Sequence, residues 1–219
     1  LSRYDFCAMG SAVLNGSVWP LDQEYTAKAL GYAKTGDNAF DSVHMAGNDF
    51  PYEASQIVQS LMMHITNFIQ DFMVQYAQTR PWIILQKAGS TYISSAMPQK
   101  RNPGPLIDVR RDASEVINES NGTLMRVHNL MPGMYDGKDL PLGRQLFDDA
   151  VTVMDNFTEV VGMLKVNAER ALEELNSDWT ASQEVADILM HRFNVPFRVG
   201  HHFASAMVTY ARTHELTPL

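Results

Sequence analysis

A stretch of small and hydroxyl-bearing residues contains the side chains best suited to proton transfer. It spans residues 89–103 and reads G-S-T-Y-I-S-S-A-M-P-Q-K-R-N-P, which places Ser94, Ser95, Lys100 and Asn102 within nine residues. A hydroxyl, a fixed positive charge and an amide are the groups needed to remove a weakly acidic carbon-bound proton and stabilise the resulting carbanion. The alternative interpretation is a surface loop rich in Ser, Gly and Pro that carries an exposed lysine.

We expect this stretch to be a loop, because it lacks a helical period and is interrupted by Pro98 and Pro103. Apolar-periodic segments flank it on both sides, and a long loop between helices is more often functional than idle. The helix expected after the loop, over 105–129, begins with a charged turn and a half. We interpret those charges as a solvated or salt-bridged face, and they are Asp108, Arg110, Arg111 and Asp112.

The segment 51–78 predicts the longest helix of the chain, with Pro51 in its first turn, where proline is tolerated. Its apolar residues recur at spacings of three and four and form two adjacent stripes. The stripes are Ile57, Leu61, Ile65, Phe68, Phe72 and Tyr76, and then Val58, Met62, Ile69 and Met73. An apolar surface this wide needs several neighbours. We therefore expect helices from sister subunits to pack against it.

Apolar periodicity and turn residues predict an all-α fold. The remaining helices are expected at about 22–30, with Asp22 as its cap, and at 41–48, 145–166, 168–175, 181–193 and 196–214, with Thr180 and Ser182 as possible caps. Residues 1–167 would form part of a central long-helix bundle, with the candidate catalytic loop at about 85–103. Residues 168–219 would form a small C-terminal helical domain.

Composition narrows the class of protein. The chain has 17 basic and 25 acidic residues, a net charge of −8, which argues against nucleic acid as the main partner. The sequence contains no uncharged apolar run of about 18 residues, so it predicts no membrane span. Cys7 is the single cysteine, which excludes an internal disulfide and suits a reducing cytoplasm. No secretory or transit signal is recognisable, and we expect a portion of a longer protein.

Three histidines are candidates for chemistry. His64 lies in the middle of the expected helix 51–78, and His201 and His202 are adjacent in the last expected helix. No carboxylate or thiol lies at ligand spacing from the histidine pair, so packing or a polar network is favoured over metal binding. For His64 we likewise favour a core or interface role over a catalytic one.

The string from Ser94 to Pro103, S-S-A-M-P-Q-K-R-N-P, resembles the signature G-S-S-x-M-P-x-K-x-N-P of the fumarase/aspartase superfamily, especially its argininosuccinate lyase branch. Ile93 departs from the glycine usual at that position. Other stretches resemble the same branch. They are G-S-A-V-L-N-G and P-L-D-Q-E before the central helices, and V-P-F-R-V-G-H-H at 195–202.

This resemblance implies a homotetramer whose central domains form one helical bundle, with active sites shared between subunits. It implies that Ser94 acts as the base, as an alkoxide, with Ser95 a less favoured base, and that Lys100 and Asn102 bind the carboxylate on which charge accumulates. No metal or organic cofactor is implied. The matching substrate-binding positions are Ser95, Met97, Tyr135, Lys138 and Arg144.

The chain departs from the family pattern on the acid side. The acid-side histidine of the family and its N-terminal serine loop are not in the chain. The glutamate that pairs with that histidine falls on Ile107, with Asp108 one residue later. Either a shift of the helix lets Asp108 take the place of that glutamate, or the pKa of the catalytic acid is set in a different way.

A second departure lies in the loop that reads the amine half of the substrate. The family loop Y-N-K-D-L-Q-E-D-K appears here as Y-D-G-K-D-L-P-L-G-R, with Pro141, Leu142 and Gly143 in place of Gln-Glu-Asp. The resemblance thus implies elimination of an amine from an N-substituted aspartate, with release of fumarate. Alternatives are a related lyase for another aminopolycarboxylate such as ethylenediamine-disuccinate, a non-catalytic crystallin-like homologue, and an unrelated helical interaction bundle.

Overall fold

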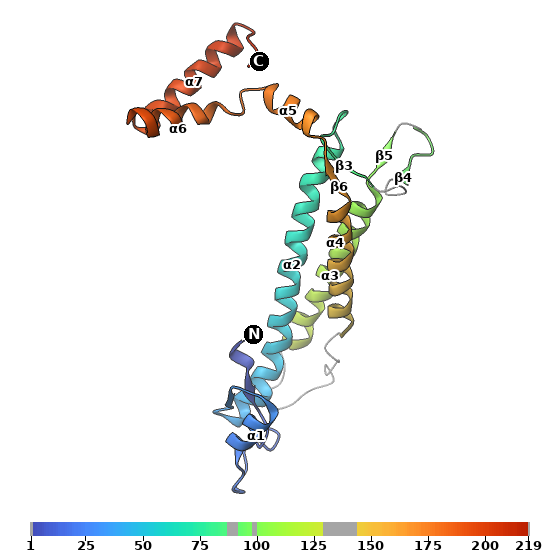
Figure 1. The fold of residues 1–219 in the computed structure, drawn as a ribbon. Coiled ribbons are helices and arrows are strands. Elements are labelled where there is room, and N and C mark those ends of the chain that lie inside the picture. The colour runs from blue at the N-terminus through green and yellow to red at the C-terminus, as the bar shows by residue number, and fades with distance from the viewer. Residues whose placement is uncertain (1, 87–91, 98–99, 129–143, 219) are drawn as a thin grey trace. The chain divides into compact units, whose positions relative to one another are not determined.

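The computed structural model describes residues 2–86, 92–97, 100–128 and 144–218, and its helical elements confirm the all-α class (Figure 1). The chain forms two compact units. The first comprises Leu1–Met73 with Ala88–Gly162, and the second comprises Val74–Lys87 with Met163–Leu219. Each unit is therefore built from two separate segments of the sequence.

Three long helices form the bundle of the first unit: α2 (Ala46–Tyr76), α3 (Gly104–Val127) and α4 (Arg144–Met163). Each buries residues at alternating spacings of three and four, the pattern of helices that pack at a shallow angle. The buried apolar residues are Met62, Ile65 and Ile69 of α2, Leu106, Val109, Ala113 and Val116 of α3, and Leu146, Ala150, Val153 and Val160 of α4. Gln59 of α2 also donates a hydrogen bond to Asn121 Oδ1 of α3 at 2.9 Å.

The start of α2 differs from the sequence-based prediction. A wide π-helical turn at Asp41–Met45 runs directly into α2, and the Ala46 N–H bonds to the Asp41 carbonyl. Pro51 therefore lies inside the helix, where it removes one backbone hydrogen bond. Its side chain is buried, so apolar contact offsets that loss. The two separate helices expected at 41–48 and 51–78 are one continuous element.

The residues before α2 form short elements. β1 (Phe6–Cys7) pairs in parallel with β2 (Lys34–Thr35), and α1 (Gln23–Leu30) lies between them. The predicted cap is confirmed, because Asp22 Oδ1 accepts a hydrogen bond from the Tyr25 N–H at 2.8 Å. Gly31 ends α1 in the left-handed conformation at φ 84°, which glycine adopts without strain.

The second unit contains an antiparallel ribbon and three helices. β3 (Ile83–Leu85) pairs with β6 (Leu164–Val166) in the register Ile83 to Val166. The expected helix 145–166 is therefore too long, because its last residues pair with a strand. The helices are α5 (Ala168–Asn176), α6 (Ser182–Phe193) and α7 (Phe197–Thr213), and the cap of α6 is Ala181 rather than Thr180 or Ser182.

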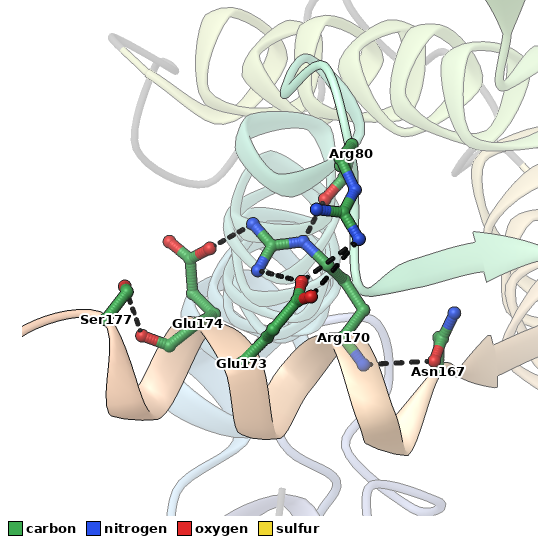
Figure 2. Close-up of polar contacts among 6 residues, drawn as sticks. All are labelled: Arg80, Asn167, Arg170, Glu173, Glu174 and Ser177. Atoms are coloured by element: carbon green, nitrogen blue, oxygen red, sulfur yellow. Dashed lines mark hydrogen bonds and ion pairs between the residues drawn. The ribbon is translucent and has the colours of Figure 1, made fainter. Parts of the chain in front are cut away.

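Arg170 connects α5 to the segment that precedes β3 (Figure 2). Its Nε donates to the Arg80 carbonyl at 3.0 Å, and its guanidinium also contacts Glu174 and, at 3.4 Å, Glu173. The Arg80 side chain also forms an ion pair with Glu173 at 3.0 Å. The Arg170 side chain is only 17% exposed, so this cluster is shielded more than an ordinary surface ion pair. Asn167 caps α5 by accepting from the Arg170 N–H.

Candidate active site

The candidate loop contains a short hairpin immediately before α3 (Figure 1). β4 (Tyr92–Ile93) pairs antiparallel with β5 (Arg101–Asn102), in the register Tyr92 to Asn102 and Ile93 to Arg101. Ser94 directly follows β4 and Lys100 directly precedes β5, so both adjoin the Ile93–Arg101 pair. Because directly paired residues lie on the same face of a hairpin, Tyr92 and Asn102 share one face. The hairpin thus brings together both ends of the S-S-A-M-P-Q-K-R-N-P string.

Ser94 is half-buried, and its hydroxyl oxygen faces two backbone donors. The N–H of Met97 donates to Ser94 Oγ at 3.1 Å, and the N–H of Ala96 donates at 3.3 Å. Hydrogen bonds of this kind favour a negatively charged oxygen over a neutral hydroxyl. Ser95 and Met97 follow on the turn and are exposed. Ser94 is thus the serine whose hydroxyl oxygen accepts from two backbone N–H groups.

Lys100 and Asn102 lie on the returning side of the hairpin. Lys100 is exposed, and its backbone N–H bonds to the Met97 carbonyl at 3.0 Å. Asn102 is half-buried and donates through Nδ2 to the Tyr92 carbonyl at 3.3 Å. This bond fixes the orientation of the amide.

A polar cluster joins the hairpin to α3. The Tyr92 hydroxyl donates to Asp108 Oδ2 over a short contact, and Arg111 donates to Asp108 Oδ1 at 3.0 Å. Arg111 also pairs with Asp112 at 2.9 Å, so the charged first turns of α3 are salt-bridged, as predicted. The bond to Asp108 raises the pKa of Tyr92 above its ordinary value. Tyr92 is not among the residues predicted from the sequence to form the site.

Gly104 explains how the Tyr92 ring reaches α3. A Cβ at this position would lie 2.7 Å from ring atoms of Tyr92, closer than real Cβ contacts. The absence of a side chain at the first turn of α3 therefore leaves room for the ring. A glycine directly after the Asn-Pro pair was the sequence signal for this contact. Ile107, the position that matches the family glutamate, is 36% exposed.

Of the remaining predicted substrate-binding residues, the structure describes Arg144, which does not lie beside the hairpin in one chain. Arg144 is the first residue of α4, pairs with Asp148 at 3.2 Å, and its side chain is 92% exposed. α4 starts at the end of the bundle opposite the hairpin (Figure 1). The 24 residues of α3 span about 36 Å between those ends. Tyr135 and Lys138 fall outside the described residues.

An acidic pocket of about 220 Å³ lies between α3 and α4, away from the hairpin. Its carboxylates are Asp112, Glu115, Glu119 and Asp149. Partial burial, and then repulsion by Asp149 and Glu115, raises the pKa of Glu119. This environment disfavours further negative charge, so we do not place the carboxylate-binding site here.

The candidate histidines of the described part of the chain do not form a metal site. His64 is exposed on α2, and the His201 ring lies 6.1 Å from that of Phe197. Within residues 2–86, 92–97, 100–128 and 144–218, no cluster of three His, Cys, Asp or Glu side chains could hold a metal ion. No helix in those same ranges is long and apolar enough to cross a bilayer.

Residues 1–117, which include the whole hairpin, match a family model described as Lyase. The chain belongs to this lyase family. The argininosuccinate lyases of Listeria innocua and Desulforamulus reducens are 32% and 31% identical to it over 212 residues, which is 95% of this chain and 45% of theirs. The resemblance to the argininosuccinate lyase branch is thereby confirmed. The chain spans about half the length of the curated relatives it matches.

Solved structures of the superfamily share the fold of this lyase-family chain. An EDDS lyase in complex with formate matches with a TM-score of 0.77 and 23% identity, over 99% of this chain and 43% of its own. A class II fumarase from Schistosoma mansoni matches with a TM-score of 0.68 and 17% identity, over 99% and 49%. These likenesses establish the long-helix fold.

Proposed function

We propose that the protein to which this chain belongs is a carbon–nitrogen lyase that eliminates an amine from an N-substituted aspartate and releases fumarate. The observation that carries the proposal is the pair of backbone N–H groups directed at Ser94 Oγ, in a loop whose returning side begins with Lys100, directly before β5. A serine hydroxyl is a weak base until its charged form is stabilised. Backbone donors and a nearby ammonium group supply that stabilisation.

Ser94 would take the proton from the carbon next to the substrate carboxylate. The electron pair of the broken C–H bond first accumulates on that carboxylate as an aci-carboxylate. It then forms the C=C bond of fumarate while the C–N bond breaks, and the amine leaves with its electron pair and a proton from a general acid. Lys100 and Asn102 would bind the charged carboxylate, since fixed cations and amide donors stabilise such charge.

The position of Arg144 supports a site shared between subunits. In one chain, the length of α3 separates Arg144 from Ser94, which is too far for one small substrate to contact both. A homotetramer of antiparallel helices would bring the two ends of different copies together. The amine-side residues Tyr135, Lys138 and Arg144 would then come from one copy and Ser94 from another.

The test is fumarate release by the whole protein, followed by ultraviolet absorbance. Ser94→Ala should lower kcat by several orders of magnitude, because it removes the base, while the assembly persists. Ser95→Ala is the comparison: as a change at a substrate-binding position it should raise KM but keep most of kcat. Full activity in Ser94→Ala would eliminate Ser94 as the base, and equal losses in both variants would point to a structural effect of the turn.

A second function differs only in the amine. The loop positions Pro141, Leu142 and Gly143 lack the polar groups that read a guanidinium in the argininosuccinate branch. A buried guanidinium without acceptors would lose about 1–3 kcal/mol for each unpaired contact. The protein would then prefer an aminopolycarboxylate such as ethylenediamine-disuccinate.

Comparing the two substrates separates these functions. We expect kcat/KM for argininosuccinate to be about two orders of magnitude below that for ethylenediamine-disuccinate, since several partners are missing at once. A higher kcat/KM for argininosuccinate would reject the loop argument and favour the activity named for the curated relatives. No fumarate from either substrate would leave the crystallin-like, non-catalytic alternative.

A further inference from the structure

We propose that Tyr92, Asp108 and Arg111 form a latch that positions the Ser94 hairpin, and that Asp108 is therefore not the carboxylate partner of a catalytic acid. This inference rests on the proposed function, and it concerns residues to which the family resemblance assigns no role except the open alternative at Asp108. The three residues connect β4 to the second turn of α3. Tyr92, Asp108 and Arg111 would be positioning residues.

Both oxygens of Asp108 are already occupied. Oδ2 accepts from the Tyr92 hydroxyl, and Oδ1 accepts from Arg111 at 3.0 Å. A carboxylate held in this way has its orientation fixed from two sides. Each oxygen keeps a further lone pair, so a histidine of another segment would have to approach from a direction that Tyr92 and Arg111 leave open. The geometry therefore favours the alternative in which Asp108 does not replace the family glutamate and a different group sets the pKa of the general acid.

The latch acts on the strand that leads directly to the proposed base. Tyr92 is two residues before Ser94 and is paired in register with Asn102, whose amide bonds to the Tyr92 carbonyl. Each strand of the hairpin is only two residues long, which gives few backbone bonds to hold it. The side chain of Tyr92 adds an anchor on a 24-residue helix. Rigid support of this kind keeps a reacting group in its productive geometry.

The contact between the ring and the helix backbone is also specific. The Tyr92 ring occupies the place that a Cβ of Gly104 would fill, at 2.7 Å. A tyrosine on β4, a glycine at the first turn of α3 and an acceptor at Asp108 are therefore mutually dependent. Replacement of any one of them should loosen the same hairpin.

Amide hydrogen exchange of the 219-residue chain tests the latch without any need for activity. Tyr92→Phe removes the donated bond and should raise exchange over residues 92–102 by about tenfold, with the bundle helices unchanged. Tyr25→Phe, at a 71% exposed ring of the same unit, is the control and should change nothing there. Unchanged protection of 92–102 in Tyr92→Phe would overturn the latch, whether or not the protein is a lyase.

Two substitutions of Asp108 distinguish a latch from a catalytic carboxylate. Asp108→Asn keeps an oxygen that accepts from Tyr92 and should retain most hairpin protection, whereas Asp108→Ala should raise exchange as Tyr92→Phe does. In the active whole protein, Tyr92→Phe and Asp108→Ala should each lower kcat about tenfold or more with KM nearly constant, and the double variant should be no worse. Additive losses, or Asn as damaging as Ala, would assign Asp108 a direct role in chemistry and reject the proposal.

If the protein releases no fumarate, the exchange results still decide the latch. Faster exchange with no lyase activity would keep the latch and reject the proposed function. Normal exchange with lost activity in Tyr92→Phe would reject the latch and keep the function.

Discussion

Phe68 of α2 meets Phe157 of α4 edge to face, with ring centroids 5.3 Å apart and an interplanar angle of 89°. Phe68 also contacts Phe72 at 4.5 Å, yet 39% of its surface remains exposed. Ile69, the next residue, is fully buried. The two apolar stripes of α2 are therefore not equivalent: the stripe with Met62 and Ile69 packs within the chain, and the stripe with Leu61 and Phe68 is partly uncovered.

The uncovered stripe should be an interface between copies. Leu61 is 39% exposed in one chain, so Leu61→Asp should leave the bundle helical but lower the mass seen by sedimentation, because it would bury an unpaired charge on association. Ile69→Asp, at a position with no exposure, should instead unfold the chain, at a cost of several kcal/mol. Leu61→Met is the conservative control. An unchanged sedimenting species in Leu61→Asp would place the interface elsewhere.

Gly104→Ala should destabilise the chain, although alanine is the better helix former. The added Cβ would meet the Tyr92 ring at 2.7 Å, and overpacking of this kind costs about 1–3 kcal/mol. Gly122→Ala in the same helix has open space around the added atom and should stabilise by about 0.5–1 kcal/mol. Thermal melts of the two variants should therefore shift in opposite directions. A gain in Tm for Gly104→Ala would mean that the ring moves away without loss.

Arg170→Met should loosen the second unit. It removes the donor to the Arg80 carbonyl and the partner of Glu174, at a cost of about 1–3 kcal/mol for a shielded site. Arg212→Met removes an ion pair to Asp178 whose side chains are 63% and 54% exposed, and it should change stability little. Amide exchange over β3 and β6 measures the difference. Equal effects of the two variants would argue that Arg170 acts as an ordinary surface charge.

Glu119→Gln should stabilise the chain at neutral pH. The folded state raises the pKa of Glu119, so the carboxyl binds its proton more tightly in the folded than in the unfolded chain. At pH values above the ordinary pKa of 4.5, ionisation of this carboxyl therefore opposes folding. Because the residue is more than a third exposed, we expect a Tm gain of only about 1–2 °C. The gain should disappear below pH 4.5, where the carboxyl is protonated in both states. A gain that persists at low pH would have another origin.

Spacing in the sequence predicted the helices well, because the alternation of three and four is preserved in the buried residues of α2, α3 and α4. It could not decide which of two equally apolar stripes faces the same chain. It also extended α4 too far, because Leu164 continues the helical period and the competing partner, Leu85, is distant in sequence. The loop at Ser94 followed from the motif, whereas the pairing of β4 with β5 and the bond from Tyr92 to Asp108 depend on how the loop folds back onto α3.

The ribbon of β3 and β6 has a consequence for biosynthesis. The second unit takes its first strand from Ile83–Leu85 and its second from Leu164–Val166, with α3 and α4 made in between. As the chain leaves the ribosome, the edge of β3 stays unpaired until its partner β6, which follows α4, has been synthesised. A peptide of residues 163–219 alone would contain α5, α6 and α7 but lack the strand that β6 pairs with. Chaperone binding near β3 during translation would keep this edge from pairing with other chains.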